Sequence, residues 1–408
     1  MYASFSRALA ATAVLALATT AQAQHPVVQN IIAGVSVDSL VWELERLSGE
    51  EPVNVGNGDQ LILSRNKNNA GNALAADWLQ QRFAALGYTP RVQLFGSTGE
   101  NIIATKPGVV HPERKVVICG HYDAMPGGPV NAPAADDDGS GSAAVLEAAR
   151  LMAPYTFENT IVFALWDEEE QGLVGSHYYA GAQAASDSQI VATVNMDAIA
   201  YDGDGDGLLR IHTRPVANSI ALKDTALMVN TTYGLDLNIA VNNPGATYSD
   251  HAAFWSEGYS AILVIEDFDN DGNPHYHTPT DLIEYMDLEY WRDLARLSLG
   301  TAAVMAIPFD ESTGIVAAPL VRESERLNVF PNPCAASATV RCAVEDGRSV
   351  RVSLTDATGR EVRVLHEGGL SAGSHTFTMD MSGLPAGAYV VRMAGSGSAR
   401  ALRLLHLP

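Results

Sequence analysis

Cysteine and basic residues are both scarce in this chain of 408 residues. The three cysteines form no Cys-x-x-Cys pair and no Cys/His spacing of the zinc-finger kind, so that class is excluded. Lys and Arg number 25 against 47 Asp and Glu, a formal net charge of −22. Nucleic acids and anionic membranes bind basic patches, so neither is expected as a partner. With 47% hydrophobic residues, the chain can still bury a large core.

Long hydrophobic runs are also missing, so no transmembrane segment is expected. The best candidate, residues 8–18, is mostly apolar and follows Arg7, but it is too short to span a bilayer. It precedes Ala21-Gln22-Ala23, a small-x-small cleavage site. Residues 1–23 are therefore predicted to be a secretory signal. We expect the mature chain to start near Gln24 and to be exported through the periplasm, either secreted or held at the cell surface.

The positions of the three cysteines suggest different roles. Cys119 lies in a predicted buried strand and is expected to be an inert core thiol. Cys334 and Cys342 are close together near the C-terminus, where one disulfide could form in an oxidising compartment.

Helical and strand patterns alternate along residues 24–307. Apolar residues at helical spacing predict helices at 37–47, 73–86, 142–152, 219–229 and 288–305. Short apolar runs predict strands at 92–95, 101–104, 116–119, 160–166, 190–196, 208–212 and 261–265. This alternation predicts a three-layer α/β/α domain with a mostly parallel central sheet.

The pattern changes after residue 307. Residues 308–326 are predicted to be a linker. In residues 327–408, short strands such as 349–354, 362–365 and 388–392 lie between turns rich in Gly, Pro and Asp. This arrangement predicts a small antiparallel β-sandwich, without a cluster of His, Asp or Glu that suggests chemistry.

Metal-type side chains follow the buried strands of the α/β domain. They are His121 and Asp123 after strand 116–119, Asp136 to Asp138 before helix 142–152, Glu168 to Glu170 after strand 160–166, Asp197 after strand 190–196, and His277 in a later loop. Open α/β sheets bind ligands at the carboxyl ends of their strands. Imidazole and carboxylate ligands suit zinc, and paired metal ions about 3.5–4 Å apart catalyse amide and phosphate hydrolysis.

Each of these pieces also has an ordinary structural explanation. A lone His-x-Asp is usually a hydrogen bond, three aspartates are usually a solvated loop, and three glutamates usually favour a helix N-terminus. Their shared position after buried strands of one domain favours a common site.

The chain at this point resembles the M28 zinc aminopeptidases of the bacterial leucyl-aminopeptidase type. The matching motifs, in the order of the family, are Gly120-His121-Tyr122-Asp123, Ala135-Asp136-Asp137-Asp138-Gly139-Ser140-Gly141, Glu169-Glu170-Gln171-Gly172-Leu173-Val174-Gly175-Ser176, Asn195-Met196-Asp197 and Tyr276-His277-Thr278-Pro279-Thr280-Asp281. Together they span most of residues 36–307, which would form a zinc-exopeptidase domain.

The resemblance implies two zinc ions and a set of residue roles. The implied metal ligands are Asp137 as the bridge, His121 and Asp197 on one zinc, and Glu170 and His277 on the other. Glu169 would be the general base, and Asp123 would orient His121.

Three nearby residues compete for these roles. His251, in Tyr248-Ser249-Asp250-His251, looks like a ligand in isolation, but the family pattern favours His277. Members of the family often stabilise the oxyanion with a tyrosine before the Ser-Asp segment. Tyr248 is close to that position but not in the same register. His275 is expected to be a loop residue.

Two acidic loops raise the question of calcium. Asp202-Gly203-Asp204-Gly205-Asp206-Gly207 and Asp267-Phe268-Asp269-Asn270-Asp271-Gly272 fit the first half of a calcium loop. Neither has Glu at the twelfth position, where Thr213 and Thr278 stand. Calcium is therefore one hypothesis, and an ordinary Asp/Gly turn is the other.

The C-terminal region resembles the type IX secretion sorting domain of Bacteroidetes-type bacteria. The motifs are Leu327-Asn328-Val329-Phe330-Pro331-Asn332-Pro333 and Leu384-Pro385-Ala386-Gly387-Ala388-Tyr389. The resemblance implies the type IX machinery as a partner, passage across the outer membrane and possible removal of the domain afterwards. The alternative is an accessory β-sandwich that binds substrate or cell wall.

The sequence thus predicts an exported, monomeric dizinc aminopeptidase that acts on peptides. The alternatives are a carboxypeptidase, a glutaminyl-cyclase-like enzyme with one zinc, and a non-catalytic binding protein on the same scaffold.

Overall fold

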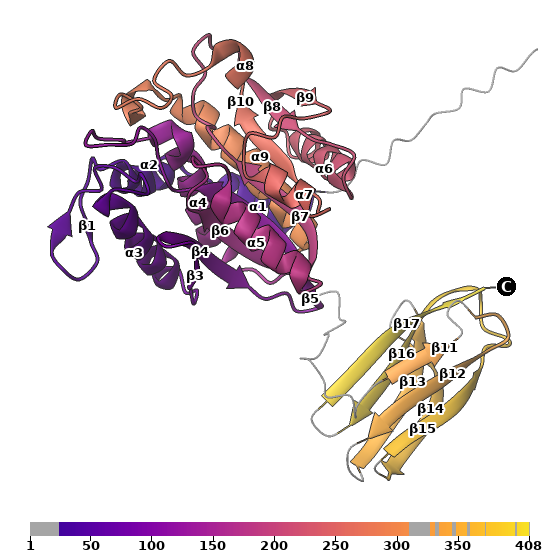
Figure 1. Ribbon diagram of the computed structural model, residues 1–408. Helices are drawn as coiled ribbons and strands as arrows, with labels where there is room; N and C mark the ends of the chain where they lie inside the picture. Colours follow the sequence, from indigo (N-terminus) through magenta and orange to yellow (C-terminus); the bar gives the residue numbers. More distant parts are fainter. Residues whose placement is uncertain are drawn as a thin grey trace, which may run out of the picture.

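The computed structural model describes residues 24–309, 327–330, 334–344, 348–356, 360–371, 373–395 and 398–407 (Figure 1). The predicted signal 1–23 and most of the predicted linker lie outside these residues. The two parts on either side of residues 310–326 are described separately below.

The first part is built on an eight-stranded sheet. Its strands, in spatial order, are β3 (Arg91–Phe95), β4 (Gly99–Lys106), β6 (Asn159–Trp166), β5 (His111–His121), β7 (Gln189–Met196), β10 (Ile262–Glu266), β8 (Leu208–His212) and β9 (Asn238–Asn242). The pairs β6–β5, β5–β7, β7–β10 and β8–β9 are parallel. The pairs β3–β4, β4–β6 and β10–β8 are antiparallel. The predicted mostly parallel sheet is therefore confirmed.

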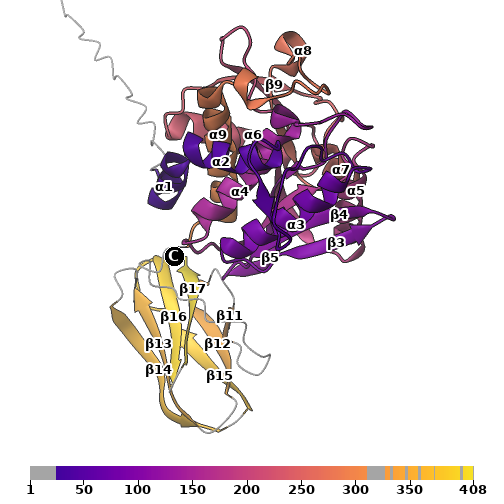
Figure 2. The same ribbon diagram turned by 90° about the vertical axis from the view of Figure 1, so that its left-hand side faces the viewer.

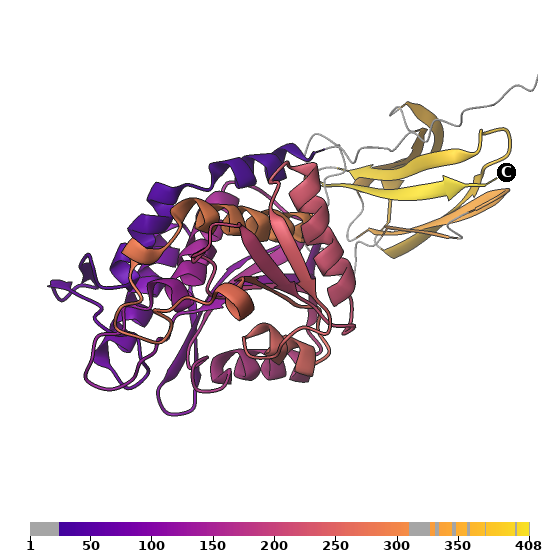
Figure 3. The ribbon, with the colours of Figure 1, turned by 90° about the horizontal axis from the view of Figure 1, so that it is seen from above.

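Helices cover both faces of this sheet, as Figures 2 and 3 show. One face carries α1 (Pro26–Gly34), α2 (Val37–Leu47), α3 (Ala70–Ala85), α4 (Gly141–Met152), α6 (Ser219–Thr232) and α9 (Leu288–Ala306), and the other carries α5 (Val174–Ala185) and α7 (His251–Ser256). Short elements are β1 (Val53–Asn54), β2 (Asp59–Gln60), a distorted turn at Ala135–Ser140, α8 (Phe268–Asp271) and a 3₁₀ turn at Ile283–Tyr285.

The layered core explains why the central strands are apolar without interruption. All eight residues of β6 are buried, because helices cover both of its faces. In β5, Val116 and Ile118 pack in the core under α4 and α9, whereas Val117 and Cys119 pack under α5 and α7. The alternation of side chains along a strand thus supplies two cores from one run.

Several helices depart from their predicted bounds for local reasons. The first residue of α3 lies three positions before the predicted start, because the Asn69 side chain accepts a hydrogen bond from Gly71 N (3.2 Å) and caps the helix. Neither α1 nor α5 was predicted. Pro26 opens α1 at its first position, and α5 follows Leu173, a left-handed residue that gives no sequence signal of a cap. No single helix among the described residues is both long and apolar enough to cross a bilayer; only α1 and α2 taken together, with a 55° bend, reach that length and composition.

The C-terminal part consists of two small antiparallel sheets around one core. The first sheet holds β11 (Leu327–Phe330), β12 (Ser337–Val344) and β15 (Gly373–Asp380), and the second holds β14 (Glu361–Leu370), β13 (Arg348–Asp356), β16 (Gly387–Gly395) and β17 (Ser398–His406). Val340 and Met379 of the first sheet pack with Val352, Leu354 and Val391 of the second. This agrees with the predicted β-sandwich.

The disulfide envisaged between Cys334 and Cys342 is absent from the structure. Both side chains are buried free thiols, as is Cys119. The backbone of Cys334 forms an isolated β-bridge with that of His406, at one end of β17. Cys342 lies well inside β12, five residues after Ser337. Five extended residues span roughly 17 Å, so the strand carries Cys342 away from Cys334.

Candidate metal centre

The predicted ligands meet at one edge of the sheet because their strands are parallel and in register. In β5, His121 lies opposite Trp166 of β6, after which Glu169 and Glu170 follow in a loop. Asp197 directly follows β7, whose partner in the sheet is also β5. The carboxyl ends of these strands therefore deliver three loops to the same place.

The first group of ligand-type side chains is His121, Glu169 and Asp197. Their ligand atoms all lie within 4.8 Å of one another. The Nε2 atom of His121 is 3.6 Å from Asp197 Oδ1 and 3.9 Å from Glu169 Oε2. Since His121 is 1% exposed, this group lies at the base of the site.

The second group is Asp137, Glu170 and His277. Their ligand atoms also lie within 4.8 Å of one another. The Nε2 atom of His277 is 2.9 Å from Glu170 Oε2 and 3.1 Å from Asp137 Oδ2. Yet His277 Nε2, Asp137 Oδ2 and Glu170 Oε1 are buried atoms without a hydrogen-bond partner of suitable geometry among the described residues. Atoms that converge without hydrogen bonding have the arrangement expected of metal ligands, and this donor set fits zinc.

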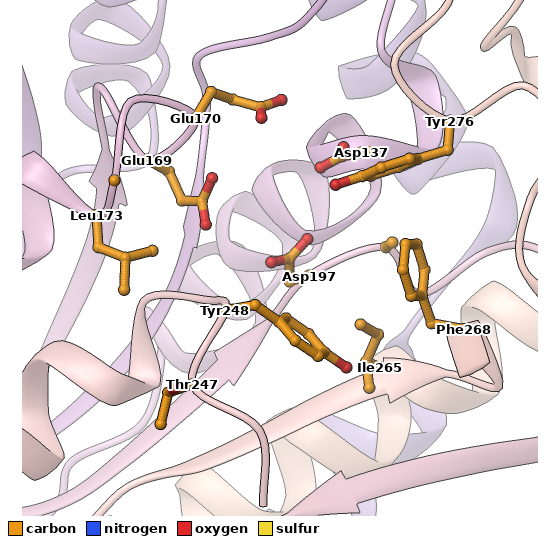
Figure 4. A pocket seen from close by; sticks show the side chains of 12 residues that line it. Asp137, Glu169, Glu170, Leu173, Asp197, Thr247, Tyr248, Ile265, Phe268 and Tyr276 are labelled. Atoms are coloured by element: carbon orange, nitrogen blue, oxygen red, sulfur yellow. The ribbon is translucent and has the colours of Figure 1, made fainter.

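Asp137 lies between the two groups. Its Oδ1 atom is 3.3 Å from His121 Nε2, while its Oδ2 atom is 3.1 Å from His277 Nε2. Figure 4 shows its carboxylate among those of Glu169, Glu170 and Asp197. One carboxylate that faces both histidines can bridge two ions.

The neighbours of Asp137 shape the loop rather than face the site. Asp138 Oδ2 accepts a hydrogen bond from His121 N (2.9 Å), and its Oδ1 accepts one from Gly141 N (2.9 Å). Asp136 accepts from Ala200 N (3.0 Å). Asp138 therefore ties the Asp137 loop to the end of β5, and Asp136 ties it to the segment after Asp197.

Asp123 contacts both His121 and the Glu169 loop. The hydrogen-bond partner of His121 Nδ1 is the main-chain oxygen of Asp123 (3.2 Å), while the carboxylate lies at 3.5 Å. The carboxylate accepts hydrogen bonds from Glu169 N (2.9 Å) and Glu170 N (3.3 Å). Asp123 thus orients the histidine with its backbone and the Glu169 loop with its side chain.

Burial and crowding of acids shift the pKa values at the centre. Burial raises the pKa of Glu169 well above its ordinary value, and it raises the pKa of Glu170 to about 7. Burial lowers the pKa of His277, but the carboxylates of Asp137 and Glu170 outweigh it and raise the pKa to about 10. The metal-free centre therefore holds protons that cations would replace.

A pocket of about 560 Å³ opens beside the two groups (Figure 4). One kind of lining residue is acidic: Asp137, Glu169, Glu170 and Asp197. The other kind is mainly apolar or aromatic: Leu173, Ala198, Tyr248, Ile265, Phe268 and Tyr276. Gly172 and Thr247 complete the lining, so none of these residues is Lys, Arg or His.

Tyr276 is a candidate functional residue that the sequence analysis did not single out. Figure 4 shows its hydroxyl end directed toward Asp137, and its ring stacks on His277 with centroids 3.8 Å apart. Burial raises its pKa, and Asp137 and Asp197 raise it further, so the hydroxyl stays protonated. The Tyr248 hydroxyl instead lies 3.5 Å from His212 Nε2, away from the carboxylates. The position of Tyr276 directly before His277 was the available sequence signal.

The two competing histidines lie outside the ligand groups. His251 is fully buried in α7, its Nε2 lies 2.9 Å from Ala246 O, and burial lowers its pKa to about 3. His275 lies 2.8 Å from Thr280 Oγ1 and stacks on Tyr285. Neither imidazole shares a group with the carboxylates of the centre.

The two acidic loops differ from each other. In the first, Asp202, Asp204 and Asp206 lie within 4.8 Å of one another. In the second, Asp267 forms an ion pair with Arg210, and Asp271 accepts hydrogen bonds from the backbone of the first loop. Part of the second loop forms α8, and two of its three aspartates hold other partners, so its carboxylates do not gather as those of the first loop do.

Comparison with known proteins adds a family match for each part. Residues 101–302 match the model of peptidase family M28, and residues 328–404 match a secretion system C-terminal sorting domain. A probable leucine aminopeptidase of Trichophyton verrucosum is 33% identical over 49% of this chain and 55% of its own length. Leucine aminopeptidase 1 of Trichophyton equinum is 30% identical over 57% of this chain and 67% of its own length. A probable zinc metalloprotease of Leptosphaeria maculans is 28% identical over 49% of this chain and 56% of its own length.

The chain thus spans between about half and two thirds of the length of these relatives. Among solved structures, the LapA aminopeptidase of Legionella pneumophila is 22% identical, with a TM-score of 0.59 over 69% of this chain and 75% of that chain. The glutaminyl cyclase of Porphyromonas gingivalis is 19% identical, with a TM-score of 0.53 over 67% of this chain and 99% of that chain. These likenesses show the fold alone.

The metal-free chain is expected to lose stability as the pH rises from 6 to 8. Burial raises the pKa of Glu170 to about 7 and that of Asp281 to about 8, so the folded chain binds more protons than the unfolded chain in this range. Folding stability then falls with pH by linkage. Melting of the chelator-treated protein should occur at least about 3 °C lower at pH 8 than at pH 6.

Zinc should reverse this trend, because the cations favour the ionised carboxylates. Added zinc should therefore raise the melting temperature more at pH 8 than at pH 6. If the melting temperature of the metal-free chain increased with pH in this range, the raised pKa values of Glu170 and Asp281 would be contradicted.

Proposed function

This chain belongs to peptidase family M28, and from that premise we propose that it is an exported zinc-dependent aminopeptidase that removes N-terminal residues from peptides. The observation that carries the proposal is the pair of ligand groups joined by Asp137 at the wall of an acidic and apolar pocket. The proposed organisation is a signal at 1–23, a peptidase domain at 24–307, a linker at 308–326 and a sorting domain at 327–408.

The proposed ligands follow the two groups. Asp137 would bridge two zinc ions, with His121 and Asp197 on one and Glu170 and His277 on the other. When bound, such a pair of ions polarises the scissile carbonyl and lowers the pKa of water at the site. The orphaned, converging atoms of the second group support this assignment.

Glu169 is the proposed general base. Its carboxylate lines the pocket beside the first group but is not required as a ligand once Asp137 bridges. The hydrogen bond from its backbone N to Asp123 fixes where its side chain starts. From there Glu169 takes a proton from the attacking water and passes it to the leaving amine.

The lining of the pocket favours a free N-terminus over a free C-terminus. Carboxylate oxygens of the lining can accept hydrogen bonds from an α-ammonium group. A carboxypeptidase needs a cationic side chain to bind the terminal carboxylate, and the pocket lining contains none. Leu173, Ile265 and Phe268 supply apolar surface for the first side chain of the peptide.

The sorting domain supports activity outside the cell. A secretion system C-terminal sorting domain at residues 328–404 indicates export by the type IX route to the cell surface or beyond. Peptides in that environment are the proposed substrates.

A substrate panel tests the reaction class. The zinc-loaded chain should hydrolyse peptides and aminoacyl-nitroanilides with a free amine, and should lose activity at least about 100-fold when the amine is acetylated, because the acetylated amine loses the charged donors that hydrogen-bond to the carboxylates of the lining. Metal analysis should find two zinc ions per chain. Cleavage from the C-terminus would favour a carboxypeptidase, and cyclisation of N-terminal glutamine with one zinc would favour a glutaminyl cyclase.

Glu169→Gln should bind zinc but lose about 10³-fold in kcat, because the amide cannot accept the proton. Metal content and kcat should be measured on the same preparation. Asp137→Asn provides the contrast, since loss of the bridge should lower zinc content as well. Turnover close to that of the wild type in Glu169→Gln would remove the general-base assignment.

Tyr276→Phe should lower kcat about 100-fold with little change in KM, because its hydroxyl is placed to donate a hydrogen bond to the oxyanion only as that charge develops. Tyr248→Phe is the matched control and should keep kcat within about threefold of the wild type. The opposite ranking of the two variants would assign the oxyanion contact to Tyr248 instead.

A further inference from the structure

A fully buried arginine reaches several loops of the candidate metal centre. Arg65 is 0% exposed, and it donates hydrogen bonds only to main-chain oxygens. Its Nε donates to Tyr122 O (2.6 Å), next to His121, and its terminal nitrogens donate to Pro133 O (2.7 Å) and Ala134 O (2.9 Å), just before the Asp137 loop. One planar guanidinium thus fixes the distance between two ligand-bearing loops.

The next two side chains extend these contacts. Asn66 Nδ2 donates to Ala124 O (3.0 Å), directly after Asp123. Lys67 Nζ donates to Glu168 Oε2 (2.9 Å), and Glu168 is the residue before the proposed base. Three consecutive residues, 65–67, therefore contact the His121 loop, the Asp137 loop and the Glu169 loop.

The chain just beyond these residues contacts the Glu169 loop a second time. Asn72 Nδ2 donates to Arg65 O (2.9 Å) and to Asp167 Oδ1 (2.9 Å), and the same Asp167 oxygen accepts from Glu168 N (2.9 Å). Both the backbone and the side chain of Glu168 are thus held from one segment of the chain.

We propose that residues 65–67 form a positioning strap that holds the Glu169 loop in register with the His121 and Asp137 loops, through the Lys67–Glu168 ion pair. The tests of the strap that measure turnover rest on the proposed function. Lys67 does not line the pocket, so it acts through Glu168 and Glu169 rather than on substrate.

The ion pair is needed because Glu168 is both buried and conformationally unusual. Its side chain is 9% exposed and its φ is +59°, a left-handed value that a non-glycine residue adopts only when its surroundings hold it. Apart from Lys67, the Glu168 carboxylate has Thr98 Oγ1 as a partner (3.2 Å). Loss of the Lys67 cation leaves a buried charge with one neutral donor, and the loop can relieve it by moving outward.

Lys67→Met tests the strap, since it keeps most of the length and the apolar stem of the side chain and removes its charge. We expect kcat of the zinc-loaded enzyme to fall by about 10- to 100-fold with KM within about twofold, because a small displacement of a catalytic group affects turnover before binding. Lys67→Arg should restore kcat to within about threefold of the wild type. A kcat for Lys67→Met within twofold of the wild type would overturn the proposal.

A distant lysine is the matched control. Lys115 is also partly buried and has two polar partners, Gln183 Oε1 (2.6 Å) and Ser188 Oγ (3.1 Å), but it lies six residues before His121 in β5, about 20 Å from the centre. Lys115→Met should keep kcat. An equal loss of kcat in this variant would show that removal of any half-buried lysine suffices, and would also overturn the strap.

Double variants and hydrogen exchange separate the strap from the proposed function. Glu168→Gln combined with Lys67→Met should lose no more kcat than Lys67→Met alone, because both changes break one contact. In the metal-free protein, the amides of residues 168–175 should exchange about tenfold faster in Lys67→Met than in the wild type. Absence of turnover in the wild type would refute the proposed function, and the exchange result would still decide the strap: unchanged exchange would refute it.

Discussion

The structure depends on holding several carboxylates close together out of water. Asp137 faces two histidines within 3.3 Å, and Glu170 joins it at the same point. Like charges so placed repel one another, and burial makes each of them costly unless it is paired. A pair of divalent cations would turn this repulsion into attraction. The rest of the α/β domain must keep the ligands in place whether or not the cations are bound.

Backbone N–H groups do much of this work. The Asp123 carboxylate accepts from two consecutive amides of the Glu169 loop, and Asp281 accepts from Asp136 N and Asp137 N. A carboxylate that accepts two amide hydrogen bonds fixes the direction of a loop without adding a cation. Holding the loops in this way also requires unfavourable backbone conformations, since His277, like Glu168, adopts a left-handed φ. Such residues persist only where surrounding contacts determine the conformation, which is what a rigid ligand set requires.

The features of this arrangement that could be predicted from the sequence are those set by residues close together in the chain. Buried parallel strands are apolar without interruption, so β5, β6 and β7 could be predicted, and their carboxyl ends located the ligand candidates. The helix α5 could not, because it follows a left-handed residue with no capping side chain. Lys67 and Glu168 are 101 residues apart in sequence, and no local pattern links them. Motifs therefore predicted which side chains gather, but not what holds them or which tyrosine faces them.

The acidic loop at Asp202–Asp206 shows why carboxylate clustering alone does not define a metal centre. Its three aspartates lie as close together as the ligands of either group. They are largely exposed, however, and their oxygens accept hydrogen bonds from the loop's own amides, as Asp202 does from Gly205 N and Gly207 N. Exposed acidic groups with local hydrogen bonds of this kind are common without a bound ion. In the second ligand group, by contrast, His277 Nε2, Asp137 Oδ2 and Glu170 Oε1 are buried and have no hydrogen-bond partner among the described residues. Burial without hydrogen bonds, rather than acidity, therefore distinguishes these three atoms as candidate metal ligands.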